Sequence, residues 1–297
     1  MILCGKTLEH APEPLRERYL PKLILGELVG AFATSEPGAS TDLSPGAMQT
    51  TATQEDTGWR VNGRKRWITN SVAADFILVL CRTGEHQTLF LADMRQEGIS
   101  VGEPDLKMGN HAQLTADVIF DNAFVSDDHV IGKVGGGLKA ALAALTLGRM
   151  GIGAIGVAMA QAAFDHACSH MEQRKVFGRE LARFQYWQFT FADHAIAIEN
   201  ARALSQKAAF RYDLEGRADT EAAMAKVVGS EVAVDVARDA IQVCGAYGFA
   251  RHVNGANQQL PLESIYRDAK VGEIYEGANE IQRWIVARKI FGRELTG

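Results

Sequence analysis

A change of pattern near Gly135 constrains this chain more than any other feature. Before it, short runs rich in β-branched and aromatic residues alternate with turn residues, and after it Ala-rich, apolar-periodic stretches continue to the end. Strands followed by helices, rather than alternating with them, are typical of α+β chains. We therefore predict an α+β fold in which an antiparallel β-barrel or sandwich domain precedes an all-α helical bundle.

The first half contains about seven candidate strands separated by turn residues. Two turn signals, Asp56-Thr57-Gly58 and Asn62-Gly63, predict hairpins. The candidate strands are ELVGAFAT, AMQTTAT, GWRV, KRWIT, DFILVLC, TLFLADM and ADVIF. Strands without intervening helical periodicity favour a compact β-domain.

The second half predicts four helices, over residues 138–172, 183–214, 220–244 and 279–291, with Thr220 as the cap of the third. Long Ala-rich helices with short connections indicate a bundle. Residues 1–26 read as a fragment of helix and loop. The predicted organisation is a remnant of a helical domain at 1–26, a β-domain at 27–134 and a C-terminal bundle at 135–297.

Composition narrows the class of protein. The formal charge of −5 gives no electrostatic attraction for nucleic acid or an anionic membrane. Four scattered cysteines without a CxxC pair are typical of a reducing compartment. No uninterrupted apolar run approaches the roughly 18 residues of a membrane span. We expect a cytoplasmic protein, with the mitochondrial matrix as the alternative.

Two motifs favour structural over functional interpretations. Residues 151–156, GIGAIG, match GxGxxG, but the preceding residues are helical, whereas a dinucleotide fingerprint needs a preceding strand. Small residues that allow close helix packing are the better interpretation. His166 and His170 share a helix face but lack a third ligand, so we predict no metal site.

Three separated segments resemble the acyl-CoA dehydrogenase family, and together they extend over essentially the whole chain. Residues 34–42, TSEPGASTD, stand in the place of the family's TEPGxGSD-like signature, and WITN at 67–70 follows. The third segment, 242–283, contains QVCGAYGF, YRDAK and IYEGANEIQR in the family's order and spacing. A block at 174–178, RKVFG, resembles the part that reaches a neighbouring subunit's flavin.

The resemblance implies FAD as cofactor and assigns its contacts residue by residue. Trp67 covers one flavin face and Thr69 bonds near the reactive nitrogen. Ala278 stands where the family usually has a threonine that touches the flavin. The implied cofactor-binding residues are Phe32, Thr34, Ser35, Ser40, Thr41, Trp67, Thr69, Arg174, Phe177, Gln185, Gln242, Gly245, Ala278 and Glu280.

The resemblance also implies the reaction, the α,β-dehydrogenation of an acyl-CoA thioester. Glu276 would abstract the α-proton, and hydride would pass to FAD. Some family members place the base just before an arginine on the first long helix, but that position here is Gly148, followed by Arg149. The implied substrate-binding residues are Thr41, Arg149 and Gly277.

Partners and alternatives follow from the same resemblance. We expect a homo-oligomer, a dimer or a homotetramer, with an electron-transfer flavoprotein as electron acceptor. Family members begin with an all-helical domain, and residues 1–26 look like its last part. The alternatives are an acyl-CoA oxidase, which passes electrons to oxygen, and a non-catalytic or truncated paralogue that acts as a partner subunit.

Overall fold

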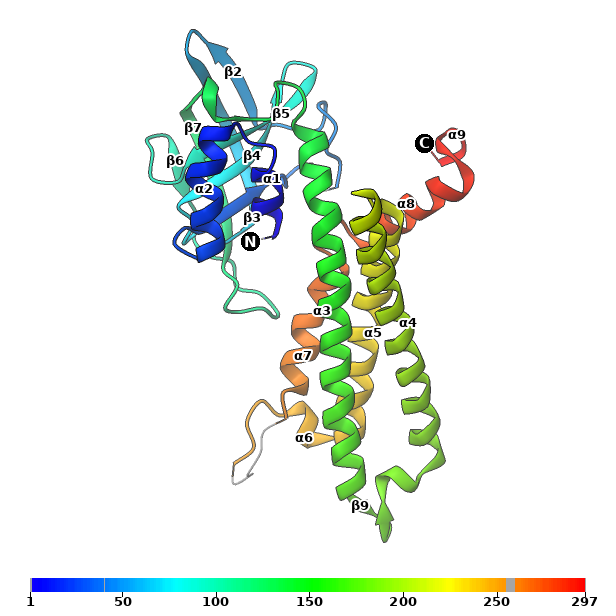
Figure 1. The fold of residues 1–297 in the computed structure, drawn as a ribbon. Helices are drawn as coiled ribbons and strands as arrows, with labels where there is room; N and C mark the ends of the chain where they lie inside the picture. Colours follow the sequence, from blue (N-terminus) through cyan, green and yellow to red (C-terminus); the bar gives the residue numbers. More distant parts are fainter. Residues whose placement is uncertain (1, 40, 255–259, 297) are drawn as a thin grey trace. The chain divides into compact units, whose positions relative to one another are not determined.

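The computed structural model describes residues 2–39, 41–254 and 260–296. The chain forms two compact units, Met1–Gly148 and Arg149–Gly297, and each has its own core. A sheet-based unit followed by a helical one confirms the predicted α+β class (Figure 1). The long helix α3 (Gly137–Gln173) begins in the first unit and continues into the second. The predicted boundaries at residues 26/27 and 134/135 stay a prediction.

The first unit is built on an eight-stranded sheet in the order β6-β7-β3-β2-β4-β5-β8, with β1 beside β4. Most pairs are antiparallel, but β1 and β2 each pair with β4 in parallel, so the sheet is mixed. The strands are β1 (Gly30–Ala33), β2 (Thr51–Glu55), β3 (Gly58–Thr69), β4 (Phe76–Thr83), β5 (His86–Asp93), β6 (Ile99–Val101), β7 (Thr115–Ser126) and β8 (Val130–Ile131). Short β6 and β8 carried no clear sequence signal.

One predicted hairpin is confirmed and the other is wrong. Glu55 pairs with Gly58 across the Asp56-Thr57 turn, as expected. Asn62-Gly63 instead lies inside the continuous strand β3, where the register with β7 shifts at a bulge. Gly63 has a φ of 145°, and a Cβ there would lie 2.6 Å from Thr50 Cα. The glycine therefore serves a close strand contact rather than a turn.

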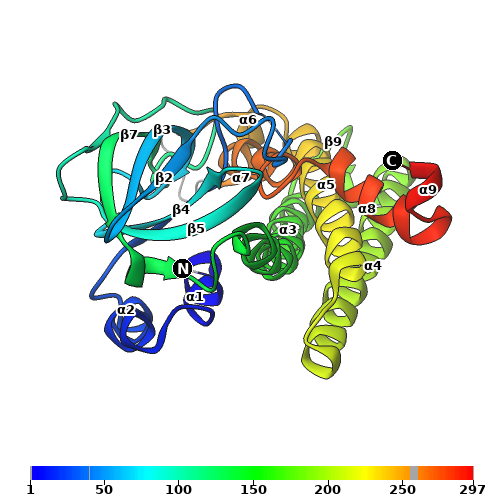
Figure 2. The ribbon, with the colours of Figure 1, turned by 90° about the horizontal axis from the view of Figure 1, so that it is seen from above.

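Residues 2–26 contain two helices that cover one face of this sheet, α1 (Ile2–Leu8) and α2 (Glu13–Leu25) (Figures 1 and 2). Their buried side chains, among them Leu8, Leu15 and Leu23, share a core with Phe76, Leu78 and other residues of β4 and β5. The Tyr19 and Phe76 rings meet edge to face at 5.0 Å. This segment is thus an integral layer of the first unit.

The second unit is a helical bundle whose main helices lie close to their predicted positions. The helix expected at 220–244 begins at Asp219, and its N-cap is Ala218, so the prediction of Thr220 as cap is wrong. The main helices after α3 are α4 (Gln185–Glu215), α5 (Asp219–Cys244) and α8 (Asn279–Phe291). Shorter elements are β9 (Lys175–Val176), β10 (Arg179–Glu180), α6 (Ala246–Phe249), α7 (Leu262–Ala269) and α9 (Arg293–Thr296), with 3₁₀ turns η1 (Asp127–His129), η2 (Leu181–Arg183) and η3 (Lys270–Glu273).

The two glycines at the end of the GxGxxG match hold α3 tightly against α5. A Cβ at Gly153 would lie 2.9 Å from the Ala225 carbonyl oxygen, and one at Gly156 would collide with the Gly229 carbonyl. A Cβ at Gly229 would lie 2.5 Å from the Gly153 carbonyl oxygen, so the close approach requires glycine on both helices. The interpretation of this motif as helix packing is confirmed.

Helix α3 also has a membrane-length stretch that a count of uninterrupted apolar residues did not reveal. By length and composition alone it is apolar enough to cross a bilayer, but 56% of that stretch is buried inside the structure. Core helices of water-soluble proteins meet the same criterion, so the stretch is weak evidence for a span.

A buried ion pair anchors the loop that follows β1. Lys65 Nζ lies 2.8 Å from Glu36 Oε1, and both side chains are almost fully buried. Glu36 also accepts hydrogen bonds from the backbone N–H groups of Gln49 and Thr50, at 2.6 and 3.0 Å, while Lys65 donates to the Thr34 carbonyl. The pair therefore ties β3 to the 34–36 segment and to the start of β2.

We predict that Lys65→Met destabilises the chain by about 3–5 kcal/mol, because it leaves the Glu36 carboxylate buried without its cation. Removing the exposed pair between Arg60 and Glu55 is the matched control and should cost about 1 kcal/mol or less. Denaturant unfolding of both variants measures the difference. Equal losses would contradict this role.

Candidate active site

Glu276 sits in a strained turn between η3 and α8. Its φ is 54° and that of Gly277 is 92°, so two successive residues are left-handed, which is costly for a glutamate. Arg149 Nε donates to the Glu276 carbonyl at 3.1 Å, and Gln282 Nε2 donates to the Gly277 carbonyl at 2.8 Å. These buried side chains fix the backbone of the turn.

The carboxyl group of Glu276 is held without a direct partner. Its Oε2 atom is shielded from solvent and has no hydrogen bond within the described part of the chain. Burial raises the pKa of Glu276 to about 7, and the positive charges of Arg149 and Lys226 oppose that rise. A carboxyl group with a pKa near neutrality is suited to accept a proton at physiological pH.

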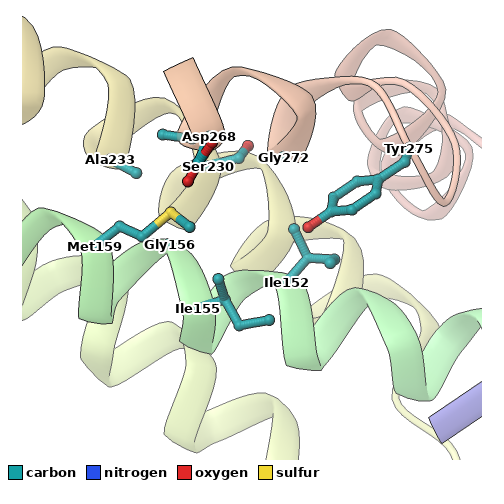
Figure 3. Close-up of a pocket in the computed structure, with 10 residues that line it drawn as sticks. Ile152, Ile155, Gly156, Met159, Ser230, Ala233, Asp268, Gly272 and Tyr275 are labelled. Atoms are coloured by element: carbon teal, nitrogen blue, oxygen red, sulfur yellow. The ribbon is translucent and has the colours of Figure 1, made fainter. Parts of the chain in front are cut away.

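A small pocket with a mostly apolar lining lies beside the turn. It adjoins Tyr275 and is walled by α3, α5 and the 268–275 segment, and Figure 3 shows the tyrosine ring reaching toward Ile152. Its volume is about 10 Å³, room for roughly one water molecule. The lining residues are Ile152, Ile155, Gly156, Met159, Ser230, Ala233, Asp268, Ala269, Gly272 and Tyr275. Burial also raises the pKa of Tyr275 to about 12.

In the first unit, the fold brings two of the predicted flavin-binding segments together. Thr34 and Ser35 follow β1, and Trp67 and Thr69 end β3. The Arg66 backbone N–H donates to the Ser35 carbonyl at 2.9 Å, which joins the two segments directly. The two segments are far apart in the sequence, so the sequence analysis did not predict this contact.

Trp67 is exposed at the end of β3 rather than packed in the core. Its indole is 55% exposed, and its φ of 61° lies in the left-handed region. The Arg66 guanidinium stacks on the ring at 4.1 Å and is itself paired with Asp117 at 2.9 Å. The sequence analysis did not predict that Arg66, Glu36 and Lys65 support this segment. The run of basic residues directly before Trp67 was the one sequence feature that pointed to Lys65 and Arg66.

The other predicted contacts of the first unit lie in β1 and in the loop that follows it. Phe32 is half-buried in β1 against the helix-covered core, and Thr41 is exposed in the loop after it. Ser40 lies outside the described residues.

In the second unit, the predicted flavin contacts fall into two groups. Ala278 and Glu280 accompany Glu276 at the start of α8, with Ala278 as its N-cap. Arg174, Phe177 and Gln185 are exposed near the far end of α3, where α6 also lies, just after Gln242 and Gly245 (Figure 1). Arg174 follows Arg149 by 25 positions along α3 and its end, roughly 37 Å at 1.5 Å per residue.

Sequence reasoning also missed three residues beside the Glu276 turn, namely Lys226, Asn279 and Gln282. All three are buried polar side chains. A lysine within the apolar run AAMAKVVG was the one signal for Lys226. Within residues 2–39, 41–254 and 260–296, no group of three His, Cys, Asp or Glu side chains is placed to hold a metal ion.

Comparison with known proteins now identifies the family. Residues 135–291 match the model of the acyl-CoA dehydrogenase C-terminal domain, and residues 31–123 match that of the middle domain. The chain is 36% identical to the mitochondrial short-chain specific acyl-CoA dehydrogenase of Rattus norvegicus, over 96% of this chain and 68% of the relative. A 3-(aryl)acrylate reductase of Clostridium sporogenes is 37% identical, over 93% of this chain and 72% of the relative.

Among solved structures, butyryl-CoA dehydrogenase from Megasphaera elsdenii superposes with a TM-score of 0.91 and 34% identity. The match covers 97% of this chain and 75% of that one. The chain therefore belongs to the acyl-CoA dehydrogenase family of flavoprotein oxidoreductases.

We predict that Glu276→Gln stabilises the chain in a pH-dependent way. The folded pKa of about 7 exceeds the ordinary value of 4.5, so the folded state keeps a proton that the unfolded chain loses. Stability from this group is fully present below about pH 4.5 and is lost as pH rises through 7. Glutamine mimics the protonated form at every pH, so the variant should gain about 3 kcal/mol at pH 8 and little at pH 4.5.

Denaturant unfolding at the two pH values measures this difference. The exposed Glu294→Gln variant is the control and should behave alike at both. A Glu276→Gln variant whose stability relative to the parent protein is independent of pH would show that the carboxyl group is solvated.

Proposed function

We propose that this chain catalyses α,β-dehydrogenation of an acyl-CoA thioester, with Glu276 as the base that removes the α-proton. The observation that carries the proposal is the half-buried Glu276 side chain, whose Oε2 atom is shielded from solvent without a hydrogen bond within the described residues and whose pKa is near neutral, in a chain of the acyl-CoA dehydrogenase family. Such a carboxylate costs stability without contributing a structural bond. A site that performs proton transfer explains its retention.

The α-C–H of a thioester is weakly acidic, so its removal needs a base and donors for the charge that develops on the carbonyl oxygen. The Glu276 side chain is the base, and we assign its own backbone N–H as one donor. The hydrogen bonds from Arg149 and Gln282 to the carbonyls of the turn hold that N–H in a fixed direction. Preorganised donors of this kind need no rearrangement during reaction.

FAD is the cofactor that we propose, and the exposed indole of Trp67 supports this choice. A flat, half-exposed aromatic ring beside the hydroxyls of Thr34 and Thr69 suits a flavin ring, and Ser35 adds a further hydroxyl on the neighbouring segment. When bound, the flavin supplies the two-electron acceptor for the β-hydride. Phe32, Ser40, Thr41, Ala278 and Glu280 are its further proposed contacts, and Gln242 and Gly245, which lie with Arg174 at the far end of α3, are proposed to contact the FAD of a neighbouring subunit.

Substrate contacts are proposed for Thr41, Arg149 and Gly277. A Cβ at Gly277 would lie 2.8 Å from Gln282 Nε2, so glycine at this left-handed position leaves room for the side chain that bonds the turn. Arg149 is almost fully buried and bonds to the Glu276 carbonyl. Its support of the turn is an addition to the predicted role in binding CoA.

We further propose a homodimer or homotetramer in which Arg174, Phe177 and Gln185 contact the FAD of a neighbouring subunit. The separation of roughly 37 Å between Arg174 and Arg149 supports this, because a cofactor at Glu276 would have to extend over that distance to reach Arg174 of the same chain. Phe177 is 97% exposed in the β9–β10 hairpin. An electron-transfer flavoprotein as acceptor and a location in the cytoplasm or mitochondrial matrix complete the proposal.

Two other activities give distinct results in simple assays. An acyl-CoA oxidase would form hydrogen peroxide with oxygen as the acceptor. A non-catalytic partner subunit would be colourless when purified or would hold flavin that substrate does not reduce. One relative is named a 3-(aryl)acrylate reductase, so the assay should follow both oxidation and reduction with artificial electron acceptors and donors.

We predict that Glu276→Gln lowers the rate of flavin reduction by acyl-CoA at least about a hundredfold, the usual contribution of a general base, while flavin affinity stays nearly constant. Glutamine keeps the shape of the side chain and removes only the basic oxygen. Anaerobic stopped-flow absorbance measures the rate, with Glu294→Gln as the matched control. Unchanged reduction by the Glu276→Gln variant would refute the assignment of the base.

For the subunit arrangement, we predict that Arg174→Ala weakens FAD binding about 10- to 100-fold, because a charge-assisted hydrogen bond to the pyrophosphate is lost. Arg183→Ala, an exposed arginine a few residues away, is the control. Sedimentation velocity with flavin absorbance measures assembly and binding together. A monomer that retains FAD tightly would contradict the proposed sharing between subunits.

A further inference from the structure

Lys226 is a fully buried lysine that the dehydrogenation chemistry does not use directly. It lies in α5 with no solvent exposure. Within the described residues its ammonium bonds to a neutral amide, donating to Asn279 Oδ1 at 2.7 Å, and pairs with no carboxylate. A buried cation without an anionic partner is costly, and an apolar side chain of the same length would pack in its place.

Asn279 connects this lysine to the Glu276 turn. It is the first residue of α8 and follows Glu276 by three positions. Its amide nitrogen donates to Ser230 Oγ at 3.1 Å and to Glu231 Oε1 at 3.2 Å, so its orientation is fixed from α5. The ammonium is thus anchored at the point where the turn enters α8.

The charges that act on this region come from α3, α5, η3, α8 and the turn itself. Arg149 lies on α3, Lys226 on α5, Glu276 in the turn, Glu273 in η3 and Glu280 on α8. Burial lowers the pKa of Lys226 to about 8 and Arg149 acts in the same direction, while the three glutamates oppose them. Asp219 also acts on Arg149, and Tyr275 adjoins Glu276. The two buried cations, one bonded to the Glu276 carbonyl and the other to Asn279 three residues on, therefore both act on the Glu276 carboxyl group.

We propose that Lys226 is a positioning residue for proton abstraction: anchored on Asn279, its buried ammonium acts with the Arg149 guanidinium to keep the Glu276 carboxylate ionised at neutral pH. The inference rests on the proposed function, in which Glu276 is the base. A base must be unprotonated to accept a proton, and burial alone favours the protonated form. The cation on α5 offsets that effect without forming a direct ion pair that would occupy the carboxylate.

Removing the positive charge of Lys226 makes the ionised carboxylate less stable, so Glu276 holds its proton to higher pH. Lys226→Met preserves side-chain length and removes the charge. We expect it to raise the titration midpoint of the Glu276 carboxyl group by at least about half a pH unit.

The first test uses the purified full chain without added cofactor or substrate. Infrared difference spectra between each protein and its Glu276→Gln counterpart isolate the carboxyl band of Glu276 and follow its titration. The matched control is Lys289→Met, which removes an exposed lysine of α8 and should leave the midpoint unchanged. A folded Lys226→Met protein with the parent midpoint would overturn the proposal.

A second variant covers the case in which Lys226→Met does not fold. Asn279→Asp keeps the shape of the amide and gives Lys226 an anionic partner, which cancels much of its field at Glu276. The midpoint should again move to higher pH, and an unchanged or lower midpoint would overturn the proposal.

The pH dependence of flavin reduction distinguishes the role of Glu276 as the base from the role of Lys226 as its positioning residue. In active protein, the acidic limb of the rate profile should shift upward in Lys226→Met by the same amount as the infrared midpoint. A parent protein that reduces flavin at no pH would refute the function of Glu276. An active parent whose limb and midpoint are unaffected by Lys226→Met would refute only the role of Lys226.

Discussion

The close packing of α3 on α5 is the constraint on which the rest of the helical unit depends. Gly153, Gly156 and Gly229 bring the two backbones so near that a single added Cβ would collide with a carbonyl group. That approach places Arg149 of α3 and Lys226 of α5 around one short turn. A bulkier residue at these positions would separate the helices and move the cations from Glu276.

The Glu276 turn combines several features that each reduce stability. Glu276 has a positive φ, and its Oε2 atom is buried without a hydrogen bond within the described residues. Lys226 is buried nearby and bonds to the neutral amide of Asn279 instead of to a carboxylate. Costs of this kind persist where the surrounding structure determines the conformation and where function requires it. The β-unit shows the same principle at Trp67, whose left-handed backbone leaves the indole exposed while Lys65 and Glu36 fix the adjoining strand from inside.

Much of this architecture was predictable from the sequence, because periodicity and motif order are local signals. The helices at α3, α4, α5 and α8 and the larger strands lie close to their expected positions. The prediction of a hairpin at Asn62-Gly63 was wrong because the glycine is required by close contact with Thr50, which is distant in sequence. The prediction of Thr220 as the N-cap was wrong because α5 already begins at Asp219, which places Thr220 inside the helix.

The candidate site was predictable only in part. Glu276, Trp67 and Arg149 belong to recognisable motifs, whereas Lys226, Asn279 and Lys65 act through contacts between segments far apart in the chain. No periodicity reveals which buried lysine faces a carboxylate. Only the three-dimensional packing, hydrogen bonds and burial identify these residues.

The most direct test of the central claim is the isotope effect on anaerobic flavin reduction by a short-chain acyl-CoA deuterated at its α-carbon. The claim is that Glu276 removes the α-proton in the step that reduces the flavin. At a pH where Glu276 is ionised, we expect reduction to be several-fold slower with the deuterated substrate. Equal rates with the two substrates, under conditions where reduction itself is rate-limiting, would contradict it.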